Sequence, residues 1–140
     1  MKIIYTADAL STQGGNARSI SSDGKLDVAL STPKELGGPG GEGTNPEQLY
    51  AAGHSSCFIG AMKFVAKREK FELPEQTSVK AMCGIAANSQ GDGFMFDVEL
   101  HIELPGMEKD VAQSLIEKAH QVCPFSNATR GNIRVALLLL

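Results

Sequence analysis

The sequence predicts an α+β fold in which antiparallel sheets surround two main helices. Residues 94–104 alternate apolar and polar side chains without a break, which is the two-residue period of a half-buried strand. Residues 48–70 leave little polar surface before a charged end, which is typical of a buried helix. Strands and helices are segregated along the chain without a strand–helix–strand repeat, which favours antiparallel pairing. A chain of 140 residues is the size of one domain, so we predict a single domain over residues 1–140.

The first thirty residues predict two or three antiparallel strands. The β-type runs IIYTA and LDVAL lie between Lys2 and Leu30. Two glycine-containing pairs separate them, Gly14-Gly15 and Asp23-Gly24, and the second pair is a common hairpin turn.

A long helix is expected next, from Gln48 to about Lys70. Pro33 and the glycine cluster at residues 37–43 interrupt regular structure before it. Thr44, Pro46 and Glu47 then supply a cap candidate, a proline suited to the first helical position and an acidic first turn. Because its residues are mostly apolar, we place this helix in the core.

The rest of the chain predicts two strands, a helix and a last strand. The alternating run SVKAMCGIA is joined to residues 94–104 by the hairpin loop NSQGDG. An apolar stripe then marks an amphipathic helix that ends at Cys123 and is stopped by Pro124; its members are Val111, Leu115, Ala119 and Val122. The strand Ile133–Leu140 closes the fold, and its VALLLL end suits an interior strand or an interface.

The charge balance argues against a polyanionic partner. The formal net charge is −3, with 13 Lys and Arg against 16 Asp and Glu, so no basic excess is available for nucleic acid or an anionic membrane. No run approaches the roughly 20 apolar residues of a membrane span. Asp8 comes too early for a secretory apolar segment, so we expect a cytoplasmic protein. Three cysteines are too few for a disulfide scaffold, and favour free thiols, a metal site or redox chemistry.

Two sequence motifs suggest binding functions, one for a dinucleotide and one for zinc. Residues 38–43 match G-x-G-x-x-G, but no strand leads into them and no acidic residue follows about 20 positions later, so we reject a dinucleotide site. The pairs His54/Cys57 and His120/Cys123 each have H-x-x-C spacing, so a zinc-stabilised module is an alternative. Cys83 lies in an alternating strand without a polar neighbour on its face, which indicates a structural thiol.

The residues around two cysteines resemble the organic hydroperoxide resistance proteins of the OsmC-like superfamily. The matching runs are GTNPEQLYAAGHSSCFIGAMKFVA and AHQVCPFSNATRGNI, with YTA, SSDGKLDV, PKELGGPGG and GFMFDVEL in the same order. The resemblance covers nearly the whole chain. It implies a cysteine-based peroxidase built as an intertwined homodimer with both active sites at the subunit interface. It also implies no metal, no bound cofactor, and recycling by lipoyl-type dithiols such as dihydrolipoamide or a lipoylated protein.

The resemblance assigns roles to four residues. Cys57 falls on the peroxidatic cysteine, Cys123 on the resolving cysteine, and Glu47 on the glutamate that orients the catalytic arginine. The family usually reads GGR after the first strand, whereas this chain reads Gly14-Gly15-Asn16-Ala17-Arg18. Arg18 is the candidate for the arginine because a two-residue displacement keeps the strand face. The alternatives are a solvated strand charge for Arg18 and a capping box with Thr44 for Glu47.

Two further positions depart from the family. His54 and Phe125 stand where tyrosine is usual. His54 is therefore a possible pH-sensitive neighbour of the thiol.

The implied chemistry constrains the site. A thiolate attacks the peroxide, and the second cysteine then converts the sulfenic acid to a disulfide. A guanidinium near Cys57 can hold the thiolate, whereas the resolving Cys123, at a helix C-terminus, can keep a high pKa. Ten residues on an unbroken helix place Glu47 and Cys57 about 15 Å apart, so either an extended arginine bridges them or the helix breaks at Gly53.

The expected lining of the site is apolar. It comprises Phe58, Met62, Phe64 and Met95. This lining favours alkyl and fatty-acid hydroperoxides. A redox sensor without peroxidase turnover remains an alternative to the enzyme.

Overall fold

The computed structural model describes residues 1–140 as two compact units, Met1–Pro46 and Glu47–Leu140. Each unit is described by itself below. None of the helices has the length and apolar character needed to span a membrane.

The first unit is a small antiparallel sheet with the strand order β1-β2-β3. Its strands are β1 (Leu10–Thr12), β2 (Arg18–Ile20) and β3 (Asp27–Ala29), followed by the 3-10 helix η1 (Lys34–Leu36). The LDVAL prediction is confirmed as β3, and the turn between β2 and β3 places Gly24 at a φ of +72°, which suits glycine. The IIYTA prediction is wrong, because these residues precede β1 without regular structure.

The second unit begins with the long helix α1 (Pro46–Glu69). The predicted start is confirmed, because Pro46 is the first helical residue. The predicted break at Gly53 is wrong, since α1 is continuous through this position. Gly53 serves close packing instead: a Cβ atom there would lie 2.7 Å from Cζ of Phe125.

A three-stranded sheet with the order β4-β5-β6 follows. β4 (Ser78–Ala87) and β5 (Phe94–Glu103) are antiparallel, but β6 (Val135–Leu139) is parallel to β5. The α+β class with two main helices and two small sheets is confirmed, whereas antiparallel pairing throughout is wrong for the last strand. The reason is the crossover through α2 (Lys109–Val122) and α3 (Pro124–Thr129), which returns the chain in the direction of β5. β6 is therefore an edge strand.

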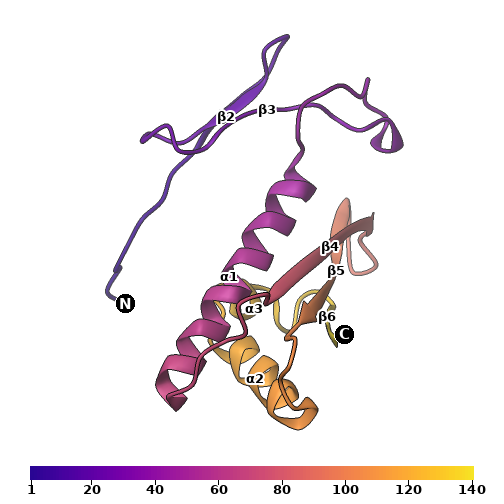
Figure 1. Cartoon of the computed structure of the whole chain (residues 1–140). Helices are drawn as coiled ribbons and strands as arrows, with labels where there is room; N and C mark the ends of the chain where they lie inside the picture. The colour runs from indigo at the N-terminus through magenta and orange to yellow at the C-terminus, as the bar shows by residue number, and fades with distance from the viewer. The chain divides into compact units, whose positions relative to one another are not determined.

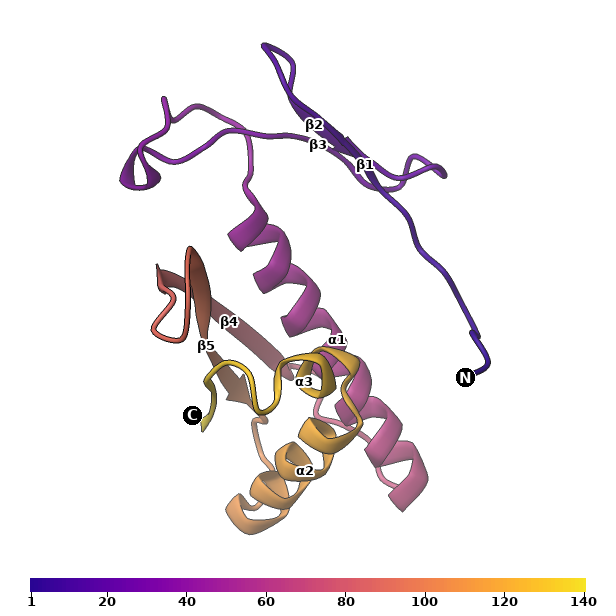
Figure 2. The same ribbon diagram turned by 180° about the vertical axis from the view of Figure 1, so that it is seen from behind.

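The helices α1 and α2 cover one face of this sheet (Figures 1 and 2). The core between them contains Phe58, Met62 and Val65 of α1, Val98, Leu100 and Ile102 of β5, and Leu115 and Ile116 of α2. The alternation of β5 is confirmed over its central residues. It fails at the start of the strand, where Phe94 is 76% exposed.

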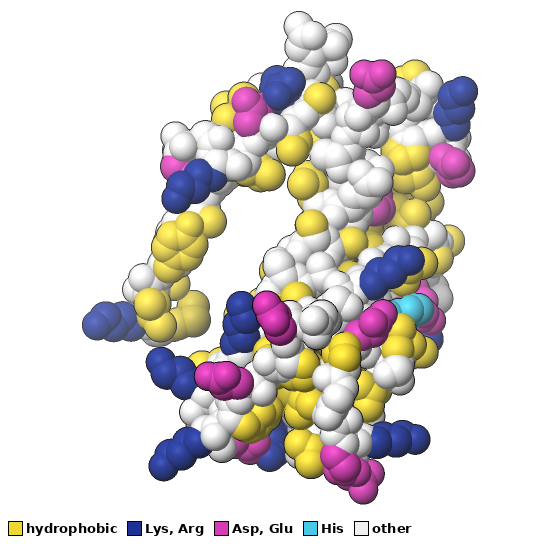
Figure 3. All heavy atoms as spheres, viewed as in Figure 1, with side chains coloured by type: hydrophobic (Ala, Val, Ile, Leu, Met, Phe, Trp, Pro, Cys, Tyr) yellow, Lys and Arg dark blue, Asp and Glu magenta, His cyan; other side chains and the backbone are white.

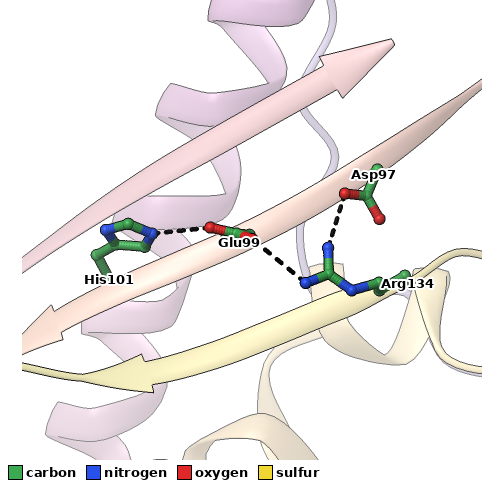
Figure 4. A network of polar contacts seen from close by, with 4 residues as sticks. All are labelled: Asp97, Glu99, His101 and Arg134. Carbon is green, nitrogen blue, oxygen red and sulfur yellow. Dashed lines mark hydrogen bonds and ion pairs between the residues drawn. The ribbon is translucent and has the colours of Figure 1, made fainter. Parts of the chain in front are cut away.

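The other face of β5 carries a polar network with Arg134 at its centre (Figure 4). Arg134 Nη1 donates to Asp97 Oδ2 over 2.7 Å, and Nη2 donates to Glu99 Oε1 over 3.2 Å. The other carboxylate oxygen of Glu99 lies 3.0 Å from His101 Nε2. The two faces of one strand thus have opposite character, as the two-residue period predicts.

Acidic and basic side chains are interspersed on the face of the molecule drawn in Figure 3. This face offers no broad surface of one sign.

Candidate active site

The sulfur atoms of Cys57 and Cys123 lie 3.3 Å apart, and both cysteines are free. A disulfide bond would bring them to about 2.05 Å, so the pair is reduced and in contact. Cys57 is half-buried on α1, whereas Cys123 is fully buried. The two sequence-predicted cysteines, 66 residues apart, are thus brought together.

The position of Cys123 follows from the sharp turn between α2 and α3. Val122 ends α2 and Pro124 begins α3, and Cys123 between them has extended backbone angles, φ −69° and ψ 122°. A residue before proline avoids the helical region, which explains this turn. The prediction that Pro124 only stops a helix is incomplete, because the same proline starts α3 at a position that suits it.

The two thiols differ in acidity. Burial raises the pKa of the Cys57 thiol, and Cys123 raises it further, against a hydrogen bond from the Phe125 backbone amide. Burial also raises the pKa of Cys123, but hydrogen bonds outweigh it and lower that pKa to about 6; they come from His54, the Ser126 amide, the Cys57 thiol and the Ser126 hydroxyl. The expectation of a high pKa for Cys123 is therefore wrong. That expectation considered only the C-terminus of α2. The Cys123 sulfur also accepts hydrogen bonds from His54 of α1 and from Ser126 of α3.

His54 lies next to Cys123 in the protein interior. It is fully buried, with Nδ1 2.9 Å from Tyr50 Oη and Nε2 3.5 Å from Ser126 Oγ. Its ring stacks on Phe125 with centroids 5.4 Å apart and an interplanar angle of 29°. His54 is thus a neighbour of a thiol, as expected, and that thiol is Cys123. Ser126 has no signal in the sequence that predicts its role, because its position depends on α3.

An apolar cavity of about 680 Å³ opens beside Cys57. It is lined by Cys57, Gly60, Ala61, Phe64, Arg68, Val122 and Pro124. Phe64 lines it as expected, and the Arg68 guanidinium lies 5.7 Å from the centre of the Phe64 ring. Phe58 and Met62 are instead fully buried in the core, and Met95 lines a different cavity. The cavity is nonetheless suited to an alkyl group next to a thiol.

Glu47 lines that different cavity, of about 670 Å³, together with Tyr50. The Oε2 atom of Glu47 is buried and has no hydrogen-bond partner. A buried carboxylate oxygen without a donor is costly, so this position suits a cationic partner. Since α1 is unbroken, Glu47 and Cys57 are about 15 Å apart along it. A helix break is thus excluded, and the bridging arginine stays a prediction.

Arg18, the predicted cation, lies on β2 of the first unit. Its Nε and Nη2 atoms donate to Asp27 Oδ1 over 2.9 and 2.5 Å. The side chain is 41% exposed. Its catalytic role stays a prediction.

No group of three or more His, Cys, Asp or Glu side chains is placed to hold a metal ion. The pairs His54/Cys57 and His120/Cys123 therefore do not form a zinc cluster. Cys83 on β4 is half-buried, and burial together with the charge of Glu47 raises the pKa of its thiol. Its structural role stays a prediction.

Residues 38–137 match the model of the family described as OsmC-like protein. The chain belongs to the OsmC-like family. A relative from Xanthomonas axonopodis pv. citri, named organic hydroperoxide resistance protein, is 56% identical over 138 residues, covering 99% of this chain and 96% of the relative. The sequence resemblance to the organic hydroperoxide resistance proteins within this family is therefore confirmed.

Solved structures of OsmC-like proteins agree with this membership. An organic hydroperoxide resistance protein from Elizabethkingia anophelis, with bound thiocyanate, has a TM-score of 0.91 and 47% identity, over 99% of this chain and 98% of that chain. One from Legionella pneumophila, also described as a predicted redox protein, has a TM-score of 0.90 and 42% identity, over 99% and 98% of the two chains. The OsmC-like fold is thus shown over nearly the full length.

Proposed function

We propose that the protein is a cysteine-based peroxidase that reduces organic hydroperoxides to alcohols. The observation that carries this proposal is the pair of reduced cysteines, 3.3 Å apart, beside an apolar cavity. The names of the relatives, organic hydroperoxide resistance proteins, support the same substrate class.

In the first step the Cys57 thiolate attacks the terminal oxygen of the hydroperoxide. The O–O bond breaks, Cys57 becomes a sulfenic acid, and the alkoxide takes up a proton and leaves as the alcohol. Cys57 is the attacking residue because it lines the cavity, whereas the more acidic Cys123 is fully buried. Access therefore decides which sulfur reacts first.

Cys57 needs a cation because burial raises the pKa of its thiol. We assign this role to Arg18, oriented by the buried Oε2 atom of Glu47 that has no donor of its own. A guanidinium can donate to a carboxylate and to a thiolate at once, and a close cation lowers a thiol pKa by about one to three units. Such a cation would shift the negative charge of the pair from Cys123 to Cys57.

In the second step Cys123 attacks the sulfenic sulfur of Cys57. The S–O bond breaks, hydroxide leaves with a proton as water, and a Cys57–Cys123 disulfide forms. A lipoyl-type dithiol, on dihydrolipoamide or a lipoylated protein, then reduces this disulfide by thiol–disulfide exchange. The cycle uses no metal and no bound cofactor.

The proposal includes an intertwined homodimer with the sites at the subunit interface, and a cytoplasmic location. The first rests on the resemblance to the family, and the second is the expectation drawn from the sequence. Analytical ultracentrifugation tests the first: a sedimentation mass of twice the chain is expected, and a monomer that retains full activity contradicts it.

A steady-state assay with dihydrolipoamide tests the function. Cumene hydroperoxide should be reduced with a higher kcat/KM than hydrogen peroxide, because the cavity beside Cys57 is apolar. Oxidation of the thiols without multiple turnover would favour a redox sensor. A stoichiometric metal whose removal unfolds the protein would favour the zinc module.

A further inference from the structure

Tyr50, His54 and Cys57 share one face of α1. Their spacing of four and three residues places them on successive turns. Tyr50 Oη lies 2.9 Å from His54 Nδ1, and the opposite ring nitrogen faces Ser126 and Cys123 at the junction of α2 and α3. His54 therefore connects a phenol on its own helix to the second cysteine of the pair.

The direction of this connection follows from Tyr50. Burial, together with Cys83 and Cys123, raises the pKa of Tyr50 to about 12, so the phenol keeps its proton at neutral pH. A phenol that keeps its proton can donate to Nδ1, and in the arrangement proposed below Nδ1 is the acceptor. A neutral imidazole then carries its hydrogen on Nε2, the nitrogen that faces Ser126 and Cys123.

We infer that Tyr50 and His54 form a relay that holds an N–H donor against the Cys123 sulfur, which makes His54 a positioning residue for disulfide formation. This inference rests on the proposed function, since disulfide formation is its second step. The stacking of the His54 ring on Phe125 and its complete burial hold the ring in this orientation.

The titratable groups packed against His54 come from its own helix and from the α2–α3 junction. Tyr50 lies on the same helix, and Cys57 and Cys123 are the cysteine pair itself. His120 of α2 is close enough to interact with His54, and burial, Arg130 and His54 all lower the pKa of His120.

The chemical consequence concerns the resolving sulfur. The attack on Cys57–SOH uses an electron pair of the Cys123 thiolate to form the S–S bond, while the S–O bond breaks and hydroxide leaves as water after taking up a proton from solvent. An N–H donor at Cys123 keeps this sulfur ionised before the attack. The hydroperoxide remains the oxidant, so the relay acts directly on the second step.

The test measures the two steps separately. In His54→Phe the donor is lost, so rapid-quench mass spectrometry at pH 7 should show disulfide formation slowed about tenfold, with sulfenic acid formation on Cys57 changed by less than about threefold. His54→Gln keeps an acceptor for Tyr50 and a donor for Cys123, and should restore most of the rate. His101→Gln, on the outer face of β5, is the matched control and should resemble the wild type.

A titration of Cys123 by its ¹³Cβ chemical shift supplies a readout that needs no peroxide. The midpoint of the Cys123 titration should rise in His54→Phe and stay near the wild-type value in His54→Gln. It should rise less in Tyr50→Phe, because without the phenol the His54 ring can also carry its hydrogen on Nδ1. If His54→Phe does not fold, the midpoints of His54→Gln and Tyr50→Phe test the inference. An unchanged midpoint and resolution rate in His54→Phe or Tyr50→Phe overturn the inference; absence of Cys57 sulfenic acid in the wild type overturns the proposed function instead.

Discussion

Cys123 is both the more deeply buried and the more acidic partner of Cys57, from which its sulfur is separated by 3.3 Å. Burial alone would make it the less acidic one. Hydrogen bonds from His54 of α1 and from Ser126 at the start of α3 reverse this order. The pair is therefore suited to the two tasks proposed for it: Cys57 is accessible to substrate, and Cys123 is buried beside it with the lower thiol pKa.

Substituting each cysteine should separate the two tasks. We expect Cys57→Ser to abolish hydroperoxide reduction, because the attacking sulfur is lost. Cys123→Ser should permit one turnover and then stall, leaving Cys57 open to sulfinic oxidation. Stopped-flow assays with mass spectrometry of Cys57 measure both outcomes. Normal multiple turnover of Cys123→Ser with dihydrolipoamide would contradict the scheme.

Removal of the charge of Arg18 should raise the pKa of Cys57. We expect Arg18→Ala to lower activity at neutral pH by about tenfold or more, since a close cation lowers a thiol pKa by about one to three units. Arg18→Lys keeps the positive charge but lacks the forked hydrogen-bond geometry of a guanidinium. Its activity should therefore lie between those of the wild type and Arg18→Ala. The measurement is the alkylation rate of Cys57 against pH.

Arg134→Ala, which removes an exposed arginine of the polar network on the outer sheet face, is the matched control for Arg18. It should leave the alkylation profile unchanged. Superimposable profiles for wild type and Arg18→Ala would mean that another cation activates Cys57.

Gly53 and Gly60, both on α1, should respond differently to alanine. A Cβ at Gly53 meets the Phe125 ring at 2.7 Å, whereas a Cβ at Gly60 meets nothing within 4 Å. We expect Gly53→Ala to lower the free energy of unfolding by about 1–3 kcal/mol through overpacking. Gly60→Ala should raise it by up to about 1 kcal/mol through helix propensity. Urea titrations measure both, and equal effects would contradict the packing role of Gly53.

The network around Glu99 should stabilise the protein only above acidic pH. Hydrogen bonds from His101 and Arg134 lower the pKa of Glu99. Its contribution is therefore present above the unfolded-state pKa and is lost as the pH falls through the lower folded-state value. The difference in unfolding free energy between wild type and Arg134→Gln should shrink as the pH falls through this range. A difference independent of pH between 3 and 7 would contradict the role of this carboxylate.

The sequence predicts the helices and strands better than it predicts how the strands pair. The long buried helix and the strand at residues 94–104 have strong periodic signals, and both are present as α1 and β5. The parallel pairing of β6 depends on the crossover through α2 and α3, which no local pattern encodes. Periodicity also identifies the buried side of β5 correctly while missing the exposure of Phe94 at its end.

The sequence likewise predicts only part of the candidate site. The motifs around Cys57 and Cys123 identify the reacting sulfurs, because they resemble a family with two cysteines. Their relative acidity could not be predicted, since it depends on hydrogen bonds to Cys123 from His54, far away in the sequence, and from Ser126 of the six-residue helix α3, which has no clear sequence signal. His54 has a visible signal, the H-x-x-C spacing, but this spacing was compatible with a metal ligand as well as with a donor to a thiol.

The central claim is that Cys57 and Cys123 form the redox-active pair. Its most direct test is peptide mapping after the reduced protein has reacted with one equivalent of cumene hydroperoxide and free thiols have been alkylated. The account predicts one intrachain Cys57–Cys123 disulfide, with Cys83 recovered in the alkylated form. A main disulfide that contains Cys83, or consumption of the hydroperoxide while Cys57 and Cys123 both remain free, would contradict it.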